Sequence, residues 1–141
     1  MDPMRTIEDQ MLHPWTFEAR CNHKPLSVNA AYYRNKKKTK AYEEYEDAWR
    51  SVLLGDALPE DIEVKSMFFS VEYEWGFSNV QADVDNPIKT TTDIMQRHFV
   101  FNDKQIRIVK ATKRLVPKGQ EYAKVKITQV FKEDLDAMER L

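Results

Sequence analysis

The sequence predicts a two-layer α+β single domain in which helices pack against a mixed β-sheet. Three observations predict it: several segments alternate with the two-residue period of strands, two segments have the spacing of amphipathic helices, and a length of 141 residues suits one domain. The expected order is strand, helix, strand, helix, strand, strand, which favours helices stacked on one sheet. We expect the domain at residues 15–131, between an N-terminal arm (1–14) and a C-terminal tail (132–141).

The first half of the chain contains the first strand and the first helix. Apolar and polar residues alternate from Trp15 to Cys21, as in a half-buried strand. The segment Lys24 to Lys38 mixes turn-forming residues with cations and is expected to be a loop. A helix should begin after Thr39, a suitable N-cap, and end before Gly55.

The second half begins with the clearest strand pattern, from Val64 to Trp75. A short helix should follow from Pro87 to about His98, with Asn86 as its cap and Pro87 at its first position. Two further strands are expected at Gln105–Val116 and Ala123–Phe131. Because the connector between them is short, we predict that these two strands pair as an antiparallel hairpin.

Composition narrows the class of protein. Hydrophobic residues make up 42% of the chain and charged residues 32%, as in an ordinary globular protein. The single cysteine, Cys21, excludes an intrachain disulfide and a multi-cysteine zinc site, and it fits a reducing cytoplasm. No run approaches the ~18 apolar residues of a membrane helix, so we expect no membrane partner.

The cations are segregated although the net charge is only −1, a value that argues against a histone-like protein. Each of two cationic runs is equally well a nucleic-acid contact or a solvated face. The first run contains Arg34, Lys36, Lys37, Lys38 and Lys40, and the second contains Lys104, Arg107, Lys110, Lys113, Arg114 and Lys118.

Two aspartates precede the second helix. Asp83 and Asp85 are two residues apart, so in an extended segment their side chains project from the same side. A hard divalent cation with oxygen ligands would offset their repulsion. The alternative is a favourable charge at a helix N-terminus, worth ~0.3–1 kcal/mol, which accounts for one aspartate but not for two. An EF-hand loop is excluded, because the sixth and twelfth positions from Asp83 are Ile88 and Ile94.

Two more charged residues complete the candidate site. Lys89 lies one helical turn after Asp85, near enough to compensate the acids or to meet a phosphate, and a surface ion pair is the alternative. Asp93 lies a further turn along, where it pairs with Lys89 at most, and we leave it outside the site. Asp103 stands in a turn ahead of a strand, where it is either a third carboxylate of the site or a turn residue.

These residues form a recognisable pattern. Asp83-x-Asp85-Asn86-x-x-Lys89, followed by Phe99-x-x-Asn102-Asp103-x-Gln105, resembles the core signature of the RusA family of Holliday-junction resolvases from bacteria and bacteriophages. The upstream Pro25-Leu-Ser-Val-Asn29 segment, with Tyr32, Tyr33 and Arg34, is similar to that family's N-terminal segment. The resemblance spans roughly residues 15–131. The chain departs from the pattern at Pro87 and in a shorter interval before Asp103.

The resemblance implies a Mg²⁺-dependent endodeoxyribonuclease that resolves Holliday junctions by paired symmetric nicks in DNA recombination and repair. In the family the corresponding residues are three catalytic acids and an essential lysine, here Asp83, Asp85, Asp103 and Lys89, with the acids as metal ligands. Mn²⁺ is the expected substitute ion. The resemblance also implies a homodimer, which would present two equivalent sites to a four-way junction, in the cytoplasm of a bacterium or a phage-infected host.

Contacts with branched DNA are expected from the loop and from the cationic strand, with the tyrosines available for stacking on unpaired bases. One alternative is a non-catalytic module that binds branched DNA. Another is a metal-dependent phosphohydrolase of small nucleotides, which would not require the cation clusters. The expected DNA-binding residues are Asn29, Tyr32, Tyr33, Arg34, Lys36, Lys37, Lys38, Lys40, Lys110 and Lys113.

Overall fold

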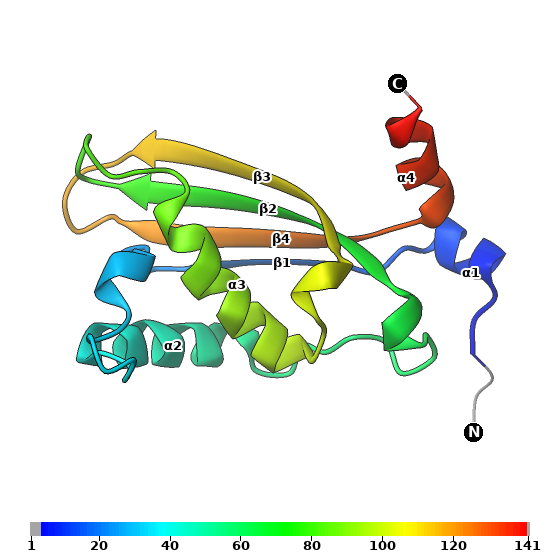
Figure 1. Cartoon of the computed structure of the whole chain (residues 1–141), viewed down its shortest axis with the longest axis horizontal. Coiled ribbons are helices and arrows are strands. Elements are labelled where there is room, and N and C mark those ends of the chain that lie inside the picture. Colours follow the sequence, from blue (N-terminus) through cyan, green and yellow to red (C-terminus); the bar gives the residue numbers. More distant parts are fainter. Residues whose placement is uncertain (1–3, 141) are drawn as a thin grey trace.

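The computed structural model describes residues 4–140 and confirms the α+β fold, with helices packed on a four-stranded mixed sheet (Figure 1). The strand order is β1-β4-β2-β3. β4 runs antiparallel to both of its neighbours, and β3 runs parallel to β2. The strands are β1 (Thr16–Cys21), β2 (Phe68–Phe77), β3 (Ile106–Leu115) and β4 (Tyr122–Val130). The helices are α1 (Ile7–Leu12), α2 (Lys40–Leu53), α3 (Asn86–Phe99) and α4 (Lys132–Glu139).

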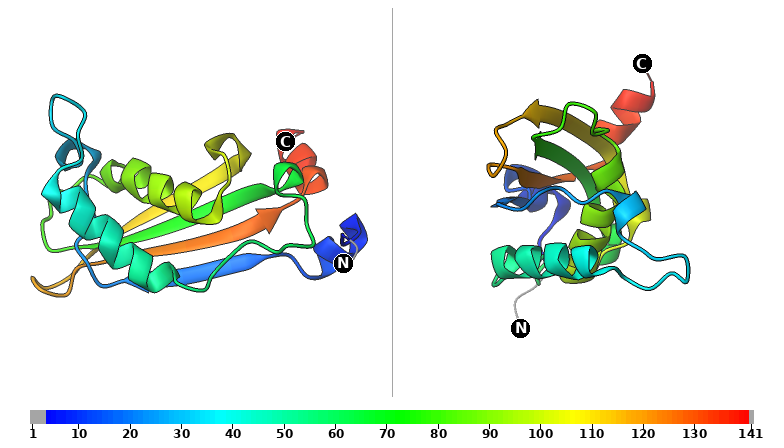
Figure 2. Two further views of the ribbon diagram at one scale, coloured as in Figure 1. Left: turned by 90° about the horizontal axis from the view of Figure 1, so that it is seen from below. Right: turned by 90° about the vertical axis from the view of Figure 1, so that its left-hand side faces the viewer.

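The core lies between the sheet and the helices α2 and α3, which cover one face of it (Figures 1 and 2). β2 contributes one buried side chain in every two, and α2 contributes a buried stripe at helical spacing. The Thr39 side chain accepts a hydrogen bond from the backbone N–H of Tyr42, which confirms the predicted cap of α2. Neither α2 nor α3 covers the opposite face of the sheet, which we call the helix-free face (Figures 1 and 2).

Hydrogen bonds made by two buried threonines of α3 connect this helix to the rest of the core. The Thr90 hydroxyl donates to the carbonyl of Leu26 at 2.7 Å, and the Thr91 hydroxyl lies 2.8 Å from the hydroxyl of Tyr45 on α2. Both threonines are buried. Because buried hydroxyl groups need partners, these bonds determine how the segment after β1 and the helix α2 sit against α3.

The predicted hairpin of the last two strands is wrong. β4 lies between β1 and β2, and β3 pairs only with β2. Four alternate residues of β4 are buried, which suits a strand with a neighbour on each side, whereas β3 exposes Arg107, Lys110 and Arg114 and suits an edge. The long crossover through α3 permits the parallel pairing of β2 with β3.

Other boundaries differ by a few residues. Val64–Ser66 is a short 3₁₀ helix, so β2 starts at Phe68. The cap of α3 is Asp85, one residue before the expected Asn86, and its side chain makes no capping hydrogen bond. Residues 7–12 of the N-terminal arm form α1, whose Gln10 accepts a 2.9 Å hydrogen bond from Gln129 in β4.

Candidate functional site

The acidic pair lies where the loop after β2 enters α3. Both Asp83 and Asp85 are exposed. Asp85 already has a helical backbone (φ −87°, ψ −22°), so the extended geometry expected from the sequence does not hold. The Asn86 side-chain amide donates to Asp83 Oδ2 at 3.3 Å. Asp83 and Asp85 line two different cavities.

A groove of about 500 Å³ between α3 and β3 receives Asp85. Lys89 also lines it, and Lys89 Nζ lies 3.6 Å from Asp93 Oδ2, which confirms the surface ion pair. Asp93 thus lines the groove as well and is one of its charged residues. The charged and amide side chains along the groove are Asp85, Lys89, Asp93, Gln96 and Asp103.

Asp103 begins a 3₁₀ turn (Asp103–Gln105) whose neighbours hold it in place. Asn102 accepts a hydrogen bond from the N–H of Lys104, and Gln105 accepts one from the N–H of Asn102, both at 2.9 Å. The Gln105 amide also donates to the carbonyls of Val64 and Met67. Asn102 and Gln105 are thus structural, and they leave the Asp103 carboxylate exposed.

The structure does not bring the three aspartates together. Asp85 is at the start of α3, whereas Asp103 follows its end (Figure 1). The side of α3 that lines the groove, from Ile88 to Gln96, rises about 12 Å at the usual 1.5 Å per residue. Among residues 4–140, no three acidic, histidine or cysteine side chains are close enough to hold a metal ion.

The second cavity, of about 370 Å³, contains Asp83 and is partly apolar. It joins three parts of the chain: the segment from His23 to Ala30, the first turns of α2, and the loop from Phe77 to Pro87. Ala30 and Ala41, which line it, flank the basic loop (residues 31–40) on either side. The base of that loop therefore adjoins the Asp83 cavity.

The basic loop projects from the domain beside the start of α2 (Figure 2). Tyr33 closes it through backbone hydrogen bonds with Lys36 and Lys37. Two cations of the loop are paired: Lys38 lies 3.2 Å from Glu46 on α2, and Lys40, the first residue of α2, lies 3.9 Å from Glu44. The cations of this loop that form no ion pair within residues 4–140 are Arg34, Lys36 and Lys37.

The remaining residues expected to contact DNA differ in their exposure and in their contacts within the protein. Asn29 is exposed in a 3₁₀ turn (Val28–Ala30), and Tyr33 is also exposed. Tyr32 is partly covered, with its ring centroid 5.4 Å from that of Tyr42. Lys113 donates to two backbone carbonyls, of Val80 at 2.6 Å and of Ala82 at 2.5 Å, so its ammonium is already used within the protein.

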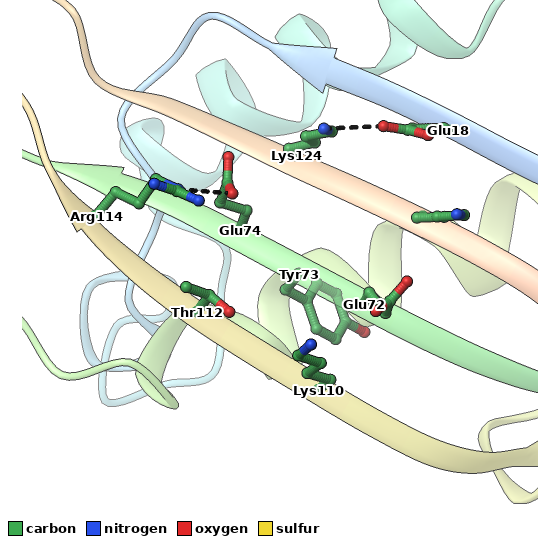
Figure 3. A pocket seen from close by; sticks show the side chains of 9 residues that line it. Glu18, Glu72, Tyr73, Glu74, Lys110, Thr112, Arg114 and Lys124 are labelled. Atoms are coloured by element: carbon green, nitrogen blue, oxygen red, sulfur yellow. Dashed lines mark hydrogen bonds and ion pairs between the residues drawn. The ribbon is translucent and has the colours of Figure 1, made fainter.

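Lys110 is directed to the opposite, helix-free face of the sheet, where it neighbours Glu72 on β2. That face holds a shallow cavity of about 320 Å³ in which acids and bases alternate across the strands (Figure 3). Lys124 lies 2.9 Å from Glu18, and Arg114 lies 2.8 Å from Glu74. Lys110 is therefore separated from the aspartates by the sheet.

Tyr73 is a residue of the groove that sequence reasoning missed. Its side chain lines the groove, and its hydroxyl is hydrogen-bonded to Thr92 on α3. Burial raises the pKa of Tyr73 to about 12, so the hydroxyl stays protonated at neutral pH. The period of β2 indicates that Tyr73 faces the helices, but only the position of α3 shows which cavity it meets.

No protein-family model matches the chain, and no curated protein matches it. No helix in the described residues is long and apolar enough to span a bilayer. The case for function therefore depends on the chemistry of the residues.

Proposed function

We propose that the protein is a Mg²⁺-dependent endonuclease that resolves branched DNA, as the resemblance to the RusA family implies. The observation that carries the proposal is the acidic pair at the start of α3, exposed and adjoined by the basic loop. Within residues 4–140 neither Asp83 nor Asp85 forms an ion pair. Exposed carboxylates without cationic partners repel one another and favour a divalent cation.

The donor set fits Mg²⁺ in chemical kind. Asp83, Asp85 and Asp103 offer only carboxylate oxygens, the ligands that this ion prefers, and all three are exposed. A bound Mg²⁺ ion would activate water and stabilise negative charge on the scissile phosphate. Asp83 and Asp85 are the principal ligands in this proposal. The resemblance gives Asp103 as the third, although the structure does not bring it together with the other two.

Lys89 supplies positive charge for the phosphate. Its pairing with Asp93 positions the ammonium along the groove wall that also carries Asp85. Both side chains are on the surface, so the pair is weak and the lysine can exchange Asp93 for a phosphoryl oxygen. Asp93 in this proposal holds Lys89 ready in the DNA-free protein.

The unpaired cations of the basic loop contact the phosphate backbone beside the Asp83 cavity, and the exposed ring of Tyr33 is available to stack on an unpaired base. A homodimer would present two such sites to a junction, one for each nick. The proposed location is the bacterial or phage-infected cytoplasm.

The deciding experiment compares a synthetic four-way junction with a linear duplex of the same sequence. Each is incubated with the protein and Mg²⁺, Mn²⁺ or a chelator. Paired nicks on the junction, only with metal and not on the duplex, are the expected result. Light scattering of the same sample gives the oligomeric state, for which two chains are expected. Cleavage that persists with chelator would contradict the metal-dependent reaction.

A second candidate is a module that binds branched DNA without cutting it. The observation that favours it is the separation of Asp103 from the acidic pair along α3. In that case the junction is retarded in a gel with or without metal and is recovered intact. The two outcomes are exclusive in the same assay.

A further inference from the structure

The loop that carries the acidic pair is attached to the sheet by side chains of two neighbouring strands. Lys113 Nζ donates to the carbonyls of Val80 and Ala82 at 2.6 and 2.5 Å. Trp75 Nε1 donates to the carbonyl of Val84 at 2.8 Å. Three alternate carbonyls of the loop therefore each receive a side-chain donor.

These donors form one unit. Trp75 in β2 and Lys113 in β3 are direct cross-strand partners in the sheet. Trp75 is fully buried and is stacked on Tyr73 at a centroid distance of 5.1 Å, so its indole is fixed. Lys113 has no acidic partner within residues 4–140, and its charge is directed only at carbonyls. A lysine whose ammonium donates to backbone carbonyls in this way holds that part of the backbone in place.

The carbonyls that receive these hydrogen bonds lie on both sides of Asp83 in the sequence. Asp83 lies between the bound carbonyls of Ala82 and Val84, and Asp85 follows directly. On the far side, the backbone carbonyl of Asp85 accepts a hydrogen bond from the N–H of Ile88 as the chain enters α3. Sheet and helix thus fix both ends of the segment, while its two carboxylates remain exposed.

We propose that Lys113 and Trp75 are positioning residues, which hold residues 80–84 so that Asp83 and Asp85 are set for metal. The proposal rests on the proposed function where it concerns the reaction, but the attachment of the loop stands apart from it. Supporting residues of this kind typically change metal affinity by 10–100-fold when they are replaced.

The attachment is tested by proteolysis of the native chain. An endoproteinase specific for aspartate cuts before Asp83 or Asp85 only when the loop opens, so the rate follows the open population. Lys113→Met keeps the alkyl chain and removes the donors, and we expect cutting there to become about tenfold faster. Trp75→Phe, which removes one neutral donor, should have a smaller effect in the same direction.

The matched control is Lys126→Met, which removes an exposed lysine from the helix-free face and should leave the cutting rate unchanged. Mass spectrometry locates the cuts. Equal rates for Lys113→Met and the wild type would overturn the attachment of the loop.

The positioning role is tested by the Mg²⁺ dependence of junction cleavage. In Lys113→Met the Mg²⁺ concentration for half-maximal rate should rise about tenfold, and Lys113→Arg, which retains charged donors, should restore it. A purely structural role would lower the maximal rate and leave the half-saturating Mg²⁺ concentration unchanged, and that result would overturn positioning. A wild-type chain that does not cut the junction would overturn the proposed function, while the proteolysis comparison still decides whether the loop is attached.

Discussion

Two charged regions of this domain differ in whether their acidic side chains have partners. On the helix-free face, Glu74 accepts hydrogen bonds from Tyr122 at 2.7 Å and from Arg114 at 2.8 Å, and these bonds lower its pKa. At the start of α3, Asp83 and Asp85 are more exposed to solvent than Glu74 and form no ion pair within residues 4–140. The density of charge therefore does not distinguish the two regions, whereas the pairing of the charges does. The acids that lack a partner are the ones that a cation or a phosphate-bound cation would recognise.

The first prediction, which has the largest expected effect, concerns the acidic pair. Asp85→Asn keeps the shape of the side chain and removes its charge, so junction cleavage should fall at least about 10²-fold while junction binding is retained. The matched control is Glu18→Gln on the helix-free face, an acid already paired with Lys124, and this variant should cleave at the wild-type rate. Single-turnover rates and gel retardation measure the two properties. Equal rates for Asp85→Asn and Glu18→Gln would remove the distinction between the two regions.

The second prediction concerns the basic loop, whose unpaired cations are Arg34, Lys36 and Lys37. If all three contact phosphates, their replacement by Gln should reduce the salt dependence of junction affinity by a log-log slope of about 3. Affinity is measured by fluorescence anisotropy between low and physiological salt.

The control for the basic loop is Lys124, a lysine on the helix-free face that already forms an ion pair. Lys124→Gln, which removes the partner of Glu18, should leave the slope unchanged. A slope that responds equally to Lys124→Gln would place the DNA on the helix-free face instead.

Much of the fold could be predicted because most elements carry their own period. The alternation in β1 and β2 and the stripe on α2 each depend on local spacing, and the cap at Thr39 depends on one side chain. The partner of β3 could not be predicted in this way, because a short connector favours a hairpin while burial places β4 in the middle of the sheet. Strand order is a property of the whole sheet.

The sequence proposes candidate site residues but does not give their arrangement in space. Sequence spacing alone groups Asp83, Asp85 and Lys89, because they are close together along the chain. The position of Asp103 depends instead on the direction in which α3 runs. Lys113 looked like a DNA contact because it belongs to a cationic run, yet its neighbours in space are the carbonyls of the acidic loop. No pattern within the run distinguishes Lys113 from Lys110 except the alternation of β3, which sends them to opposite faces.

The smallest expected effect on cleavage comes from a change on the helix-free face. Gly76 is the cross-strand partner of Tyr122, and a Cβ at Gly76 would overlap the tyrosine ring. That ring lies under the guanidinium of Arg20 at 3.9 Å and donates to Glu74, so it cannot move without loss of these contacts. Gly76→Ala should therefore lower the free energy of unfolding by about 1–3 kcal/mol.

Urea denaturation measures the cost of Gly76→Ala, and the cleavage rate per folded molecule should stay at the wild-type value. In a Tyr122→Leu background the same substitution should cost less, because the overlap is relieved and the two sites are coupled. A Gly76→Ala protein that is stable but cleaves slowly would show that the helix-free face contributes to the reaction. The partnered charges would then matter to catalysis as much as the unpartnered aspartates, and pairing would no longer separate the two regions.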